Sequence, residues 1–464
     1  MKSISLLGLI PLVSLVLTRE FPELNGVIGG APKDIILRSK VAVATPATIS
    51  TGKLRYVENS GVCKTTPKVY QASGYADLAL NQSMWFWFFA ARNNADTAPL
   101  SLTLWPGGPG SSGMMGVFRA MGPCRINQDE TTVSRNPYSW NEYSNIQLER
   151  DIHMDAAIVL WKMLQIWFAD SQFSKYATRD FAIWTESYGG HYGPVFASYF
   201  LDQHTAIAAG KIKGVKINLK VLSIGNGLTD PRSQYTGYVK YAMSNPYHPL
   251  VNESTIKSVN NTLYKPGGCM DQIDECNLNL NDTRCSMAQN YCNENMLALL
   301  VGDYDFYDAR VKKPSLYPYN ITKLLTNSSF VAQIGAGGNW TMTNYQVYGN
   351  FVTTGDWMKN SRLDLEKVIN AGVRTLILVG DADFICNHIG VEAMVNALQT
   401  KFTSEYKKQN WVSWTVAGTV AGKYKNAGTF SYLRVYQAGH EVPAYGNGEL
   451  EVGQAALVYF TQFM

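Results

Sequence analysis

The sequence predicts an α/β protein built on a doubly wound, mostly parallel sheet with a disulfide-stapled cap insertion. Two observations carry this prediction. Short apolar, β-prone runs alternate with helical segments along most of the chain, as in parallel sheets covered on both faces. Between about residues 235 and 348 the strand-like runs disappear, and Pro, Gly, cysteine and Asn-x-Ser/Thr tripeptides dominate until the strands resume. With 46% hydrophobic and 16% charged residues among 464, the chain can bury a large core, which excludes wholesale disorder.

The chain begins with one cation and then an apolar run from Ser3 to Leu17. This run is short for a bilayer span and no stop-transfer pattern follows it, so residues 1–18 are predicted to be a signal peptide. A membrane anchor is the alternative. Residues 19–51 show no strong period and are expected to form a pro-segment or an N-terminal arm, ahead of a folded domain at 52–464. The protein is therefore expected to be secreted, or to reach a vacuolar or lysosome-like compartment by the secretory route, and not to lie in a membrane.

The elements of the predicted sheet follow from local patterns. Six apolar runs have the length and composition of strands, at residues 83–91, 100–105, 180–184, 220–224, 374–379 and 432–436. Helical spacing of apolar residues predicts a helix over 155–169, and a second helix is expected over 190–200.

The cysteines favour disulfides. Four of the seven lie between Cys269 and Cys292. A zinc site there is the alternative, but no histidine is near and an exported protein meets an oxidising compartment. The pairing of the cysteines is left open by the sequence. N-linked glycans are expected at the sequons, which are Asn81, Asn252, Asn260, Asn281, Asn320, Asn327 and Asn339.

The charge pattern argues against several partners. A net charge of +4 is small for this length, and no basic stripe accompanies it, so a nucleic-acid partner is not expected. No histidine or carboxylate cluster occurs at ligand spacing along the chain. We therefore expect no metal and no other cofactor.

Ser187 lies in a segment typical of the nucleophile turn of an α/β-hydrolase. That turn joins a strand to a helix, and small residues two before and two after the serine let the strained backbone pass its neighbours. Here Thr185 and Gly189 hold those positions, a strand precedes them and a helical segment follows. Ser187 is the predicted nucleophile; an ordinary loop serine is the alternative.

A serine nucleophile needs a histidine to take its proton and a carboxylate to orient that histidine. In this fold the chain order is serine, acid, histidine. Asp383 follows the strand at 374–379, and only His388 and His440 come after it. His388 is too close to Asp383 to belong to the next loop of the sheet. The predicted triad is Ser187, Asp383 and His440; a surface histidine in a glycine-containing loop is the alternative for His440.

Four motifs, in order from about Val62 to the C-terminus, resemble the secreted serine carboxypeptidases, and most of all their fungal branch. They are Trp184–Pro194, Gly225–Pro231, Gly380–Asn387 and Ala438–Pro443. The resemblance implies release of C-terminal residues from peptides with a free C-terminus, in acidic surroundings and through an acyl-enzyme. It also implies an oxyanion hole made of the backbone amides of Gly108 and Tyr188, and an unpaired thiol, Cys386, near the site; a buried small hydrophobe without a functional role is the alternative for Cys386.

The chain departs from this family pattern where the substrate carboxylate is recognised. The family uses a polar residue before Gly-Gly-Pro-Gly, a Glu shortly before Gly-Pro and the Glu preceding the serine. Pro106 and Ala120 stand at the first two positions here. Gly107 and Glu186 are the residues expected to bind the carboxylate. Close carboxyl groups can share a proton, which would explain a preference for acid.

A second departure lies near residues 141–155. Family members have there a further strand and a pocket-lining turn, whereas residues 141–148 offer at most a short strand and several dozen residues are missing. Losing a strand beside the nucleophile is expected to open the sheet. An error in the predicted coding sequence is one explanation. With Pro106 and Ala120, this departure motivates the alternatives: a serine acyltransferase or esterase on the same fold, or a catalytically silent secreted relative.

Overall fold

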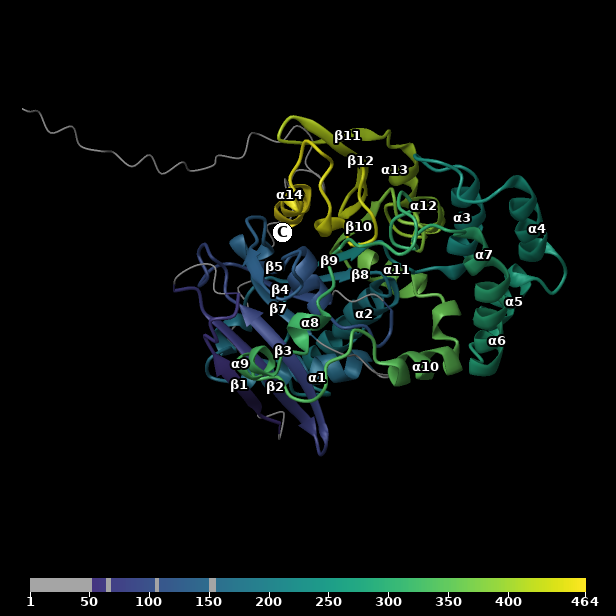
Figure 1. The fold of residues 1–464 in the computed structure, drawn as a ribbon. Coiled ribbons are helices and arrows are strands. Elements are labelled where there is room, and N and C mark those ends of the chain that lie inside the picture. Colours follow the sequence, from purple (N-terminus) through teal and green to yellow (C-terminus); the bar gives the residue numbers. More distant parts are fainter. Residues whose placement is uncertain (1–51, 64–67, 105–107, 150–155) are drawn as a thin grey trace, which may run out of the picture.

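The computed structural model describes residues 52–63, 68–104, 108–149 and 156–464 (Figure 1). The predicted signal peptide and N-terminal arm lie outside these residues. A single eleven-stranded sheet runs through the described part of the chain. Its strands, in spatial order, are β1 (Leu54–Glu58), β2 (Gln71–Ala79), β3 (Gln82–Phe89), β7 (Asn145–Glu149), β4 (Leu100–Leu104), β8 (Phe181–Glu186), β9 (Leu219–Gly225), β10 (Arg374–Gly380), β13 (Phe430–Val435), β12 (Thr419–Ala427) and β11 (Val412–Val416). A separate hairpin joins β5 (Cys124–Ile126) to β6 (Val133–Arg135).

The centre of the sheet is parallel, from β7 through β4, β8, β9 and β10 to β13. Antiparallel pairs extend it on both flanks. Each of the six strands predicted from the sequence is present. Because the carboxyl ends of parallel strands meet at one edge of a sheet, the loops after β8, β10 and β13 lie along the same edge.

Both faces of the sheet are covered, which confirms the doubly wound architecture. Along β10, Leu376 and Leu378 enter one buried cluster while Ile377 and Val379 enter another, as the two-residue period of a strand requires. The helices of the Ile377 face include α1 (Ala156–Ala169), α2 (Gly189–Ala208), α11 (Arg362–Asn370), α12 (His388–Ala397) and α13 (Thr403–Lys408). The opposite face packs against α14 (Gln454–Phe463).

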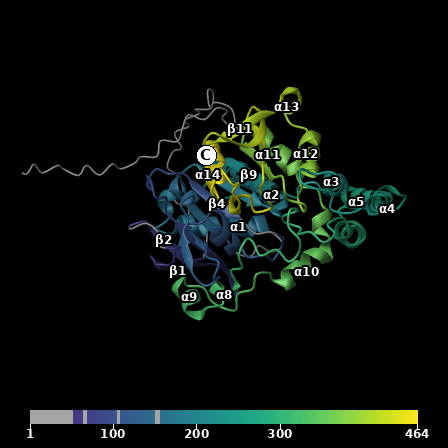
Figure 2. The ribbon, with the colours of Figure 1, turned by 45° about the horizontal axis from the view of Figure 1, so that its top comes forward.

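The insertion between β9 and β10 is helical, and residues 226–373 contribute no strand to the sheet. Before α11, its α-helices are α3 (Pro231–Met243), α4 (Glu253–Tyr264), α5 (Cys269–Asn279), α6 (Asp282–Cys292), α7 (Ala298–Leu300), α8 (Thr322–Leu325), α9 (Ser328–Gln333) and α10 (Tyr345–Thr354). Figures 1 and 2 place α4 and α5 on the side of the molecule away from β1 and β2. The helix α3 begins at Pro231 and packs against α12, so the chain does not change character at one residue. The cap boundary near residue 235 stays a prediction.

Six cysteines form disulfides, as expected, rather than a zinc site. Cys269–Cys292 and Cys276–Cys285 join α5 to α6 inside the cap, and Cys63 pairs with Cys124. Cys386 is free and buried. No helix in the described ranges combines the length and apolarity that a bilayer crossing needs.

The expectation that the shortened segment near 141–155 opens the sheet is wrong. Residues 145–149 form β7, which pairs antiparallel with β3 and parallel with β4. A strand of five residues is enough to cover the edge of β4, so the sheet is continuous up to β8. Residues 150–155, which follow β7, lie outside the described part of the chain.

Candidate active site

Ser187 occupies the turn between β8 and α2 with a φ of 60°. A non-glycine residue in this left-handed region is strained and needs firm support from its surroundings. The amide of Ser187 donates to the carbonyl of Gly225 at the end of β9 (2.9 Å), and its carbonyl accepts from the amides of Gly190 and Leu228 (2.9 Å each). The turn is thus locked by the neighbouring strand.

The small residues around Ser187 have steric reasons. A Cβ on Gly190 would lie 2.5 Å from the backbone of Leu228, and one on Gly189 would lie 2.4 Å from the Cβ of Thr185. Thr185 fits the first small position because Gly189 leaves space beside it. Its hydroxyl lies 3.1 Å from the carbonyl oxygens of both Gly189 and Ser223, within hydrogen-bonding reach of each.

Asp383 lies in the loop after β10, fully buried, and is surrounded by N–H donors. It accepts hydrogen bonds from Asn226 Nδ2 (2.7 Å) and from the amides of Ile385 (3.0 Å) and Cys386 (3.2 Å). The fourth contact joins Asp383 Oδ2 to His440 Nδ1 at 2.8 Å. Four donors therefore complement one buried carboxylate.

Asn226 is a site residue that the sequence analysis did not single out. It follows β9 inside the Gly225–Pro231 motif. Its Nδ2 donates to Asp383, and its Oδ1 accepts from the amide of Gly380 (3.1 Å). It therefore links the loop after β9 to the loop after β10. The signal was an Asn between two glycines directly after a predicted strand.

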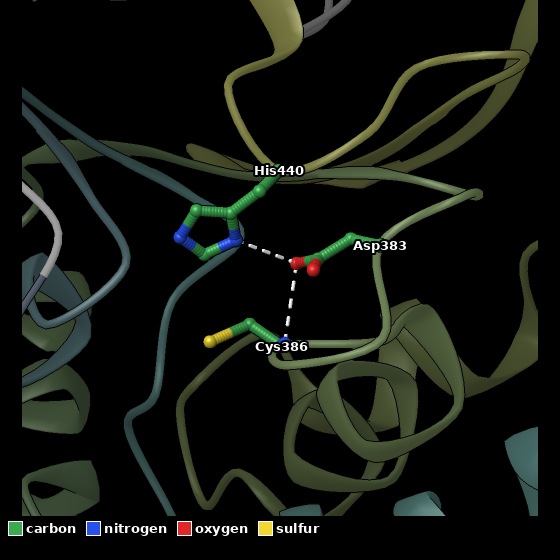
Figure 3. Close-up of side chains that lie close together, drawn as sticks. All are labelled: Asp383, Cys386 and His440. Atoms are coloured by element: carbon green, nitrogen blue, oxygen red, sulfur yellow. Dashed lines mark hydrogen bonds and ion pairs between the residues drawn. The ribbon is translucent and has the colours of Figure 1, made fainter. Parts of the chain in front are cut away.

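His440 follows β13 and meets Asp383 at the shared edge of the sheet (Figure 3). In the close-up Nδ1 faces the carboxylate and the other ring nitrogen points away from it. The amide of His440 donates to the carbonyl of Tyr307 in the cap (2.8 Å), and the two rings lie 5.1 Å apart. Nε2 is buried and has no hydrogen-bond partner among the described residues, so it is free to receive a proton.

Ser187 Oγ makes no hydrogen bond within the described part of the chain, including none to His440 Nε2. Catalytic hydrogen bonds are often longer before substrate binds and tighten in the complex. The structure thus joins Asp383 to His440 directly and brings the loop of Ser187 to the same edge of the sheet.

Cys386 lies beside this pair. Its sulfur, a carboxylate oxygen of Asp383 and a ring nitrogen of His440 lie within 4.8 Å of one another. Burial, then the charges of Asp383 and Glu186, raises the pKa of the thiol well above its usual value, so the sulfur stays protonated. The sequence shows no metal-ligand cluster at close spacing along the chain. The group of Asp383, Cys386 and His440 forms only in the tertiary structure. With Asp383 already accepting four donors and the thiol protonated, the group is an acid–histidine pair with a neighbouring thiol.

The two amides expected to form the oxyanion hole are both described. Neither the Gly108 amide nor the Tyr188 amide donates a hydrogen bond within the described ranges, so both can serve an incoming oxygen. The Tyr188 side chain is held by the chain between α10 and α11, because its hydroxyl donates to Asp356 Oδ2 (2.6 Å). Burial and the charge of Asp356 raise the pKa of Tyr188 well above its usual value, which keeps this donor protonated. Gly107 and Pro106 lie outside the described residues.

A cavity of about 240 Å³ opens beside His440. The sheet loops contribute Arg119, Glu186 and Glu441 to its wall, and the cap contributes residues such as Tyr307 and Met342. Glu186 was predicted from the sequence, whereas Arg119 and Glu441 were not, although they directly precede Ala120 and follow His440.

Glu186 lines this cavity and is 2% exposed. Burial raises its pKa well above the usual value, and the negative charges of Glu441 and Asp383 raise the pKa further. Its Oε2 is buried without a hydrogen-bond partner in the described structure. A neutral, protonated Glu186 can donate a hydrogen bond to an anion in the cavity.

The sequence and the fold both have relatives. Residues 61–451 match the family model described as serine carboxypeptidase. Carboxypeptidase S1 of Penicillium janthinellum is 37% identical over 409 residues, covering 84% of this chain and 95% of that protein. Carboxypeptidase S1 homolog A of Arthroderma otae is 30% identical, covering 85% and 74%. The solved structure of a prohormone-processing carboxypeptidase from Saccharomyces cerevisiae shares the fold, with a TM-score of 0.69 at 21% identity over 85% of this chain and 91% of that one.

Proposed function

We propose that this chain, which belongs to the serine carboxypeptidase family, removes C-terminal residues from peptides with Ser187, His440 and Asp383 as its catalytic triad. The observation that carries the assignment is the buried Asp383–His440 contact of 2.8 Å at the sheet edge that also holds the strained Ser187 turn.

The geometry suits acyl transfer. Asp383 accepts from Nδ1–H of His440 and so leaves Nε2 as the base that takes the proton of Ser187. Ser187 Oγ attacks the carbonyl carbon of the last peptide bond, and the amides of Gly108 and Tyr188 stabilise the oxyanion. His440 then gives its proton to the departing amino acid, and water releases the remaining peptide from Ser187 by the same steps.

The carboxylate of the substrate is the feature that makes a C-terminus recognisable. We assign Glu186 as a donor to it, because the raised pKa of Glu186 keeps that side chain protonated. Gly107 is proposed to bind the same carboxylate. Donation by Glu186 requires its protonated form, so binding of the substrate carboxylate is expected to be favoured in acidic surroundings.

A direct test uses N-blocked dipeptides at acidic pH, with products identified by mass spectrometry. The proposal expects release of the C-terminal residue by the wild-type protein and none by Ser187→Ala. Absence of release alongside an active family member would overturn it.

An acyltransferase or esterase is the second candidate. It rests on Ala120, which is fully buried in an apolar cluster and offers no polar group to a substrate carboxylate. Labelling of Ser187 by a fluorophosphonate, together with ester cleavage and no peptide cleavage, would favour this candidate. No labelling of a folded protein would favour a catalytically silent relative.

Export and glycosylation complete the proposal. All seven sequon asparagines are exposed, which suits modification in the secretory route. A secreted or vacuolar enzyme with N-linked glycans should lose mass on treatment with an endoglycosidase. Unchanged mass of the protein from its natural host would count against this route.

A further inference from the structure

The cavity beside His440 has little to hold an anion if only the family positions are considered. Pro106 has no side-chain donor and Ala120 faces the core, so Glu186 alone remains. A carboxylate moved from water into such a site needs charged or hydrogen-bonding partners. One further residue, Arg119, provides them.

Arg119 lies on a helical turn at 116–120, directly before Ala120. Its Nε donates to the carbonyl of Tyr319 (2.8 Å), which fixes the plane of the guanidinium. Its Nη1 donates to Glu441 Oε1 (3.1 Å), and its side chain is 11% exposed. Nη2 makes no hydrogen bond within the described part of the chain, so the fork has donors to spare.

Arg119 is also the only permanent cation among the described residues that line this cavity. The other charged or titratable groups on the wall are Glu186, Asp305, Glu441, His440 and three tyrosines, Tyr307, Tyr317 and Tyr445. A guanidinium binds a carboxylate through two parallel hydrogen bonds, which suits Arg119 to an anionic ligand.

The contact with Glu441 shows that the Arg119 guanidinium binds a carboxylate at this position. Glu441 is the residue after His440, and its Oε2 is buried with no partner in the described structure. A bound peptide would present its scissile carbonyl to Ser187 and its terminal carboxylate one residue further on, roughly 4 Å along the chain. Arg119, Glu441 and His440 line one cavity, so a carboxylate bound by Arg119 lies in the same cavity as the proposed base.

We infer that Arg119 binds the free carboxylate of the substrate, and that Glu441 occupies the guanidinium until the substrate displaces it. This inference rests on the proposed function, since it names the residue that recognises the C-terminus. It assigns Arg119 to substrate binding, and Glu441 acts through Arg119 as a positioning residue.

The test compares two substrates that differ only at the terminus: one N-blocked dipeptide as the free acid, and the same dipeptide as its amide. For Arg119→Gln we expect kcat/KM on the free acid to fall about ten- to a hundred-fold, mostly through KM, because a charged hydrogen bond is lost. Activity on the amide should stay within about threefold. Arg119→Lys should restore part of the loss, since it keeps the charge but not the fork.

Glu441→Gln should act in the opposite direction. A neutral amide competes less well for the guanidinium, so KM for the free acid should fall by about threefold or more, with little change for the dipeptide amide. Arg55→Gln is the matched control, because Arg55 forms an exposed ion pair with Asp77 far along the sheet at β1 and β2. It should change neither substrate.

Equal losses of Arg119→Gln on both substrates would indicate a structural role and overturn the inference, as would no loss at all. If the wild-type protein cleaves neither dipeptide, the proposed function fails instead. The inference is then decided by calorimetry on Ser187→Ala with an N-blocked amino acid. Binding of its free acid that Arg119→Gln abolishes would support the inference, and binding that this substitution leaves unchanged would contradict it.

Discussion

Two parts of the site are built differently. We call the first the acylating corner, which holds Asp383 and His440. The second is the carboxylate side of the cavity, which holds Glu186, Arg119 and Glu441. Asp383 accepts four donors, and its partners come from the ends of parallel strands. On the carboxylate side, two buried carboxyl oxygens, one on Glu186 and one on Glu441, have no partner in the described structure. Asp383 is fully hydrogen-bonded without substrate, whereas the cavity wall leaves carboxyl oxygens without a partner, and we propose that the substrate anion completes that wall.

The difference shows which parts of the site the backbone holds in place and which parts depend on single side chains. Backbone hydrogen bonds position the Ser187 turn and the Asp383 loop, and two tyrosines of α3 brace that loop by donating to the carbonyls of Asp381 and Ile385. The cavity wall is made of individual side chains from loops and from the cap. Such a wall can change residue by residue while the corner stays the same.

The largest expected effect comes from the nucleophile. Ser187→Ala should lower kcat for a blocked dipeptide by about 10⁵- to 10⁶-fold, because no acyl-enzyme can form. Labelling by a fluorophosphonate should disappear, while the thermal unfolding temperature changes little. Retention of labelling would place the nucleophile elsewhere and break the assignment of the corner.

Asp383→Asn should lower kcat by about 10⁴-fold. An amide at this position can present N–H to His440 Nδ1 and so favours the wrong tautomer of the imidazole. Single-turnover kinetics with an active ester would show slow acylation at unchanged KM. A rise in KM with normal acylation would mean that Asp383 belongs to the binding side of the comparison.

The pH dependence of KM probes the carboxylate side. Glu186 is protonated below its raised folded pKa and ionises as pH rises through that value. Ionisation adds a negative charge beside Asp383 and Glu441, so KM for a free-acid substrate should rise by about tenfold or more with pH. In Glu186→Gln this rise of KM with pH should weaken. An unchanged KM profile would remove Glu186 from carboxylate binding.

The same shift has a consequence for stability. A carboxyl whose pKa is higher in the folded state binds more protons than the unfolded chain between the two pKa values, so its contribution to stability falls as pH rises. Glu186→Gln removes this loss. Its unfolding temperature relative to wild type should therefore increase from acidic to neutral pH, which differential scanning calorimetry can follow.

The smallest expected effect on catalysis comes from the cap. Replacing Cys276 and Cys285 by serine removes the disulfide that closes the α5–α6 pair and should cost about 2–3 kcal/mol of cap stability. Because cap residues line the cavity and leave the acid–histidine contact untouched, KM should rise a few-fold with kcat nearly constant. A large fall in kcat would show that the cap also supports the corner.

Local pattern was enough to predict most of the sheet. The strands at 83–91, 180–184 and 374–379 are present within a few residues, because alternation, β-propensity and flanking turns are encoded in neighbouring residues. The shortened segment was misjudged for the same reason. Whether five residues at 145–149 suffice depends on β3 and β4 lying on either side, and no local pattern reports that.

The site residues also fall into those that local sequence predicts and those that depend on long-range contacts. Ser187, Asp383 and His440 were predicted from a strained turn and from the order of acid and histidine along the chain. Asn226 escaped, because its role depends on a side-chain contact with a residue 157 positions away. The sequence also left the disulfide partners open, since spacing alone does not select among the pairings.

By itself, the sequence determined the doubly wound architecture, the presence of a cap insertion and the identity and order of the three residues proposed for catalysis. These follow from backbone preferences and short-range chemistry. Only the tertiary structure decided that β7 closes the sheet, that Cys386 lies beside Asp383 and His440, and that Arg119 pairs with Glu441 across 322 positions of chain. Contacts of this range are set by how strands and loops pack in space, where a partner's distance along the chain has no bearing on its distance in the fold.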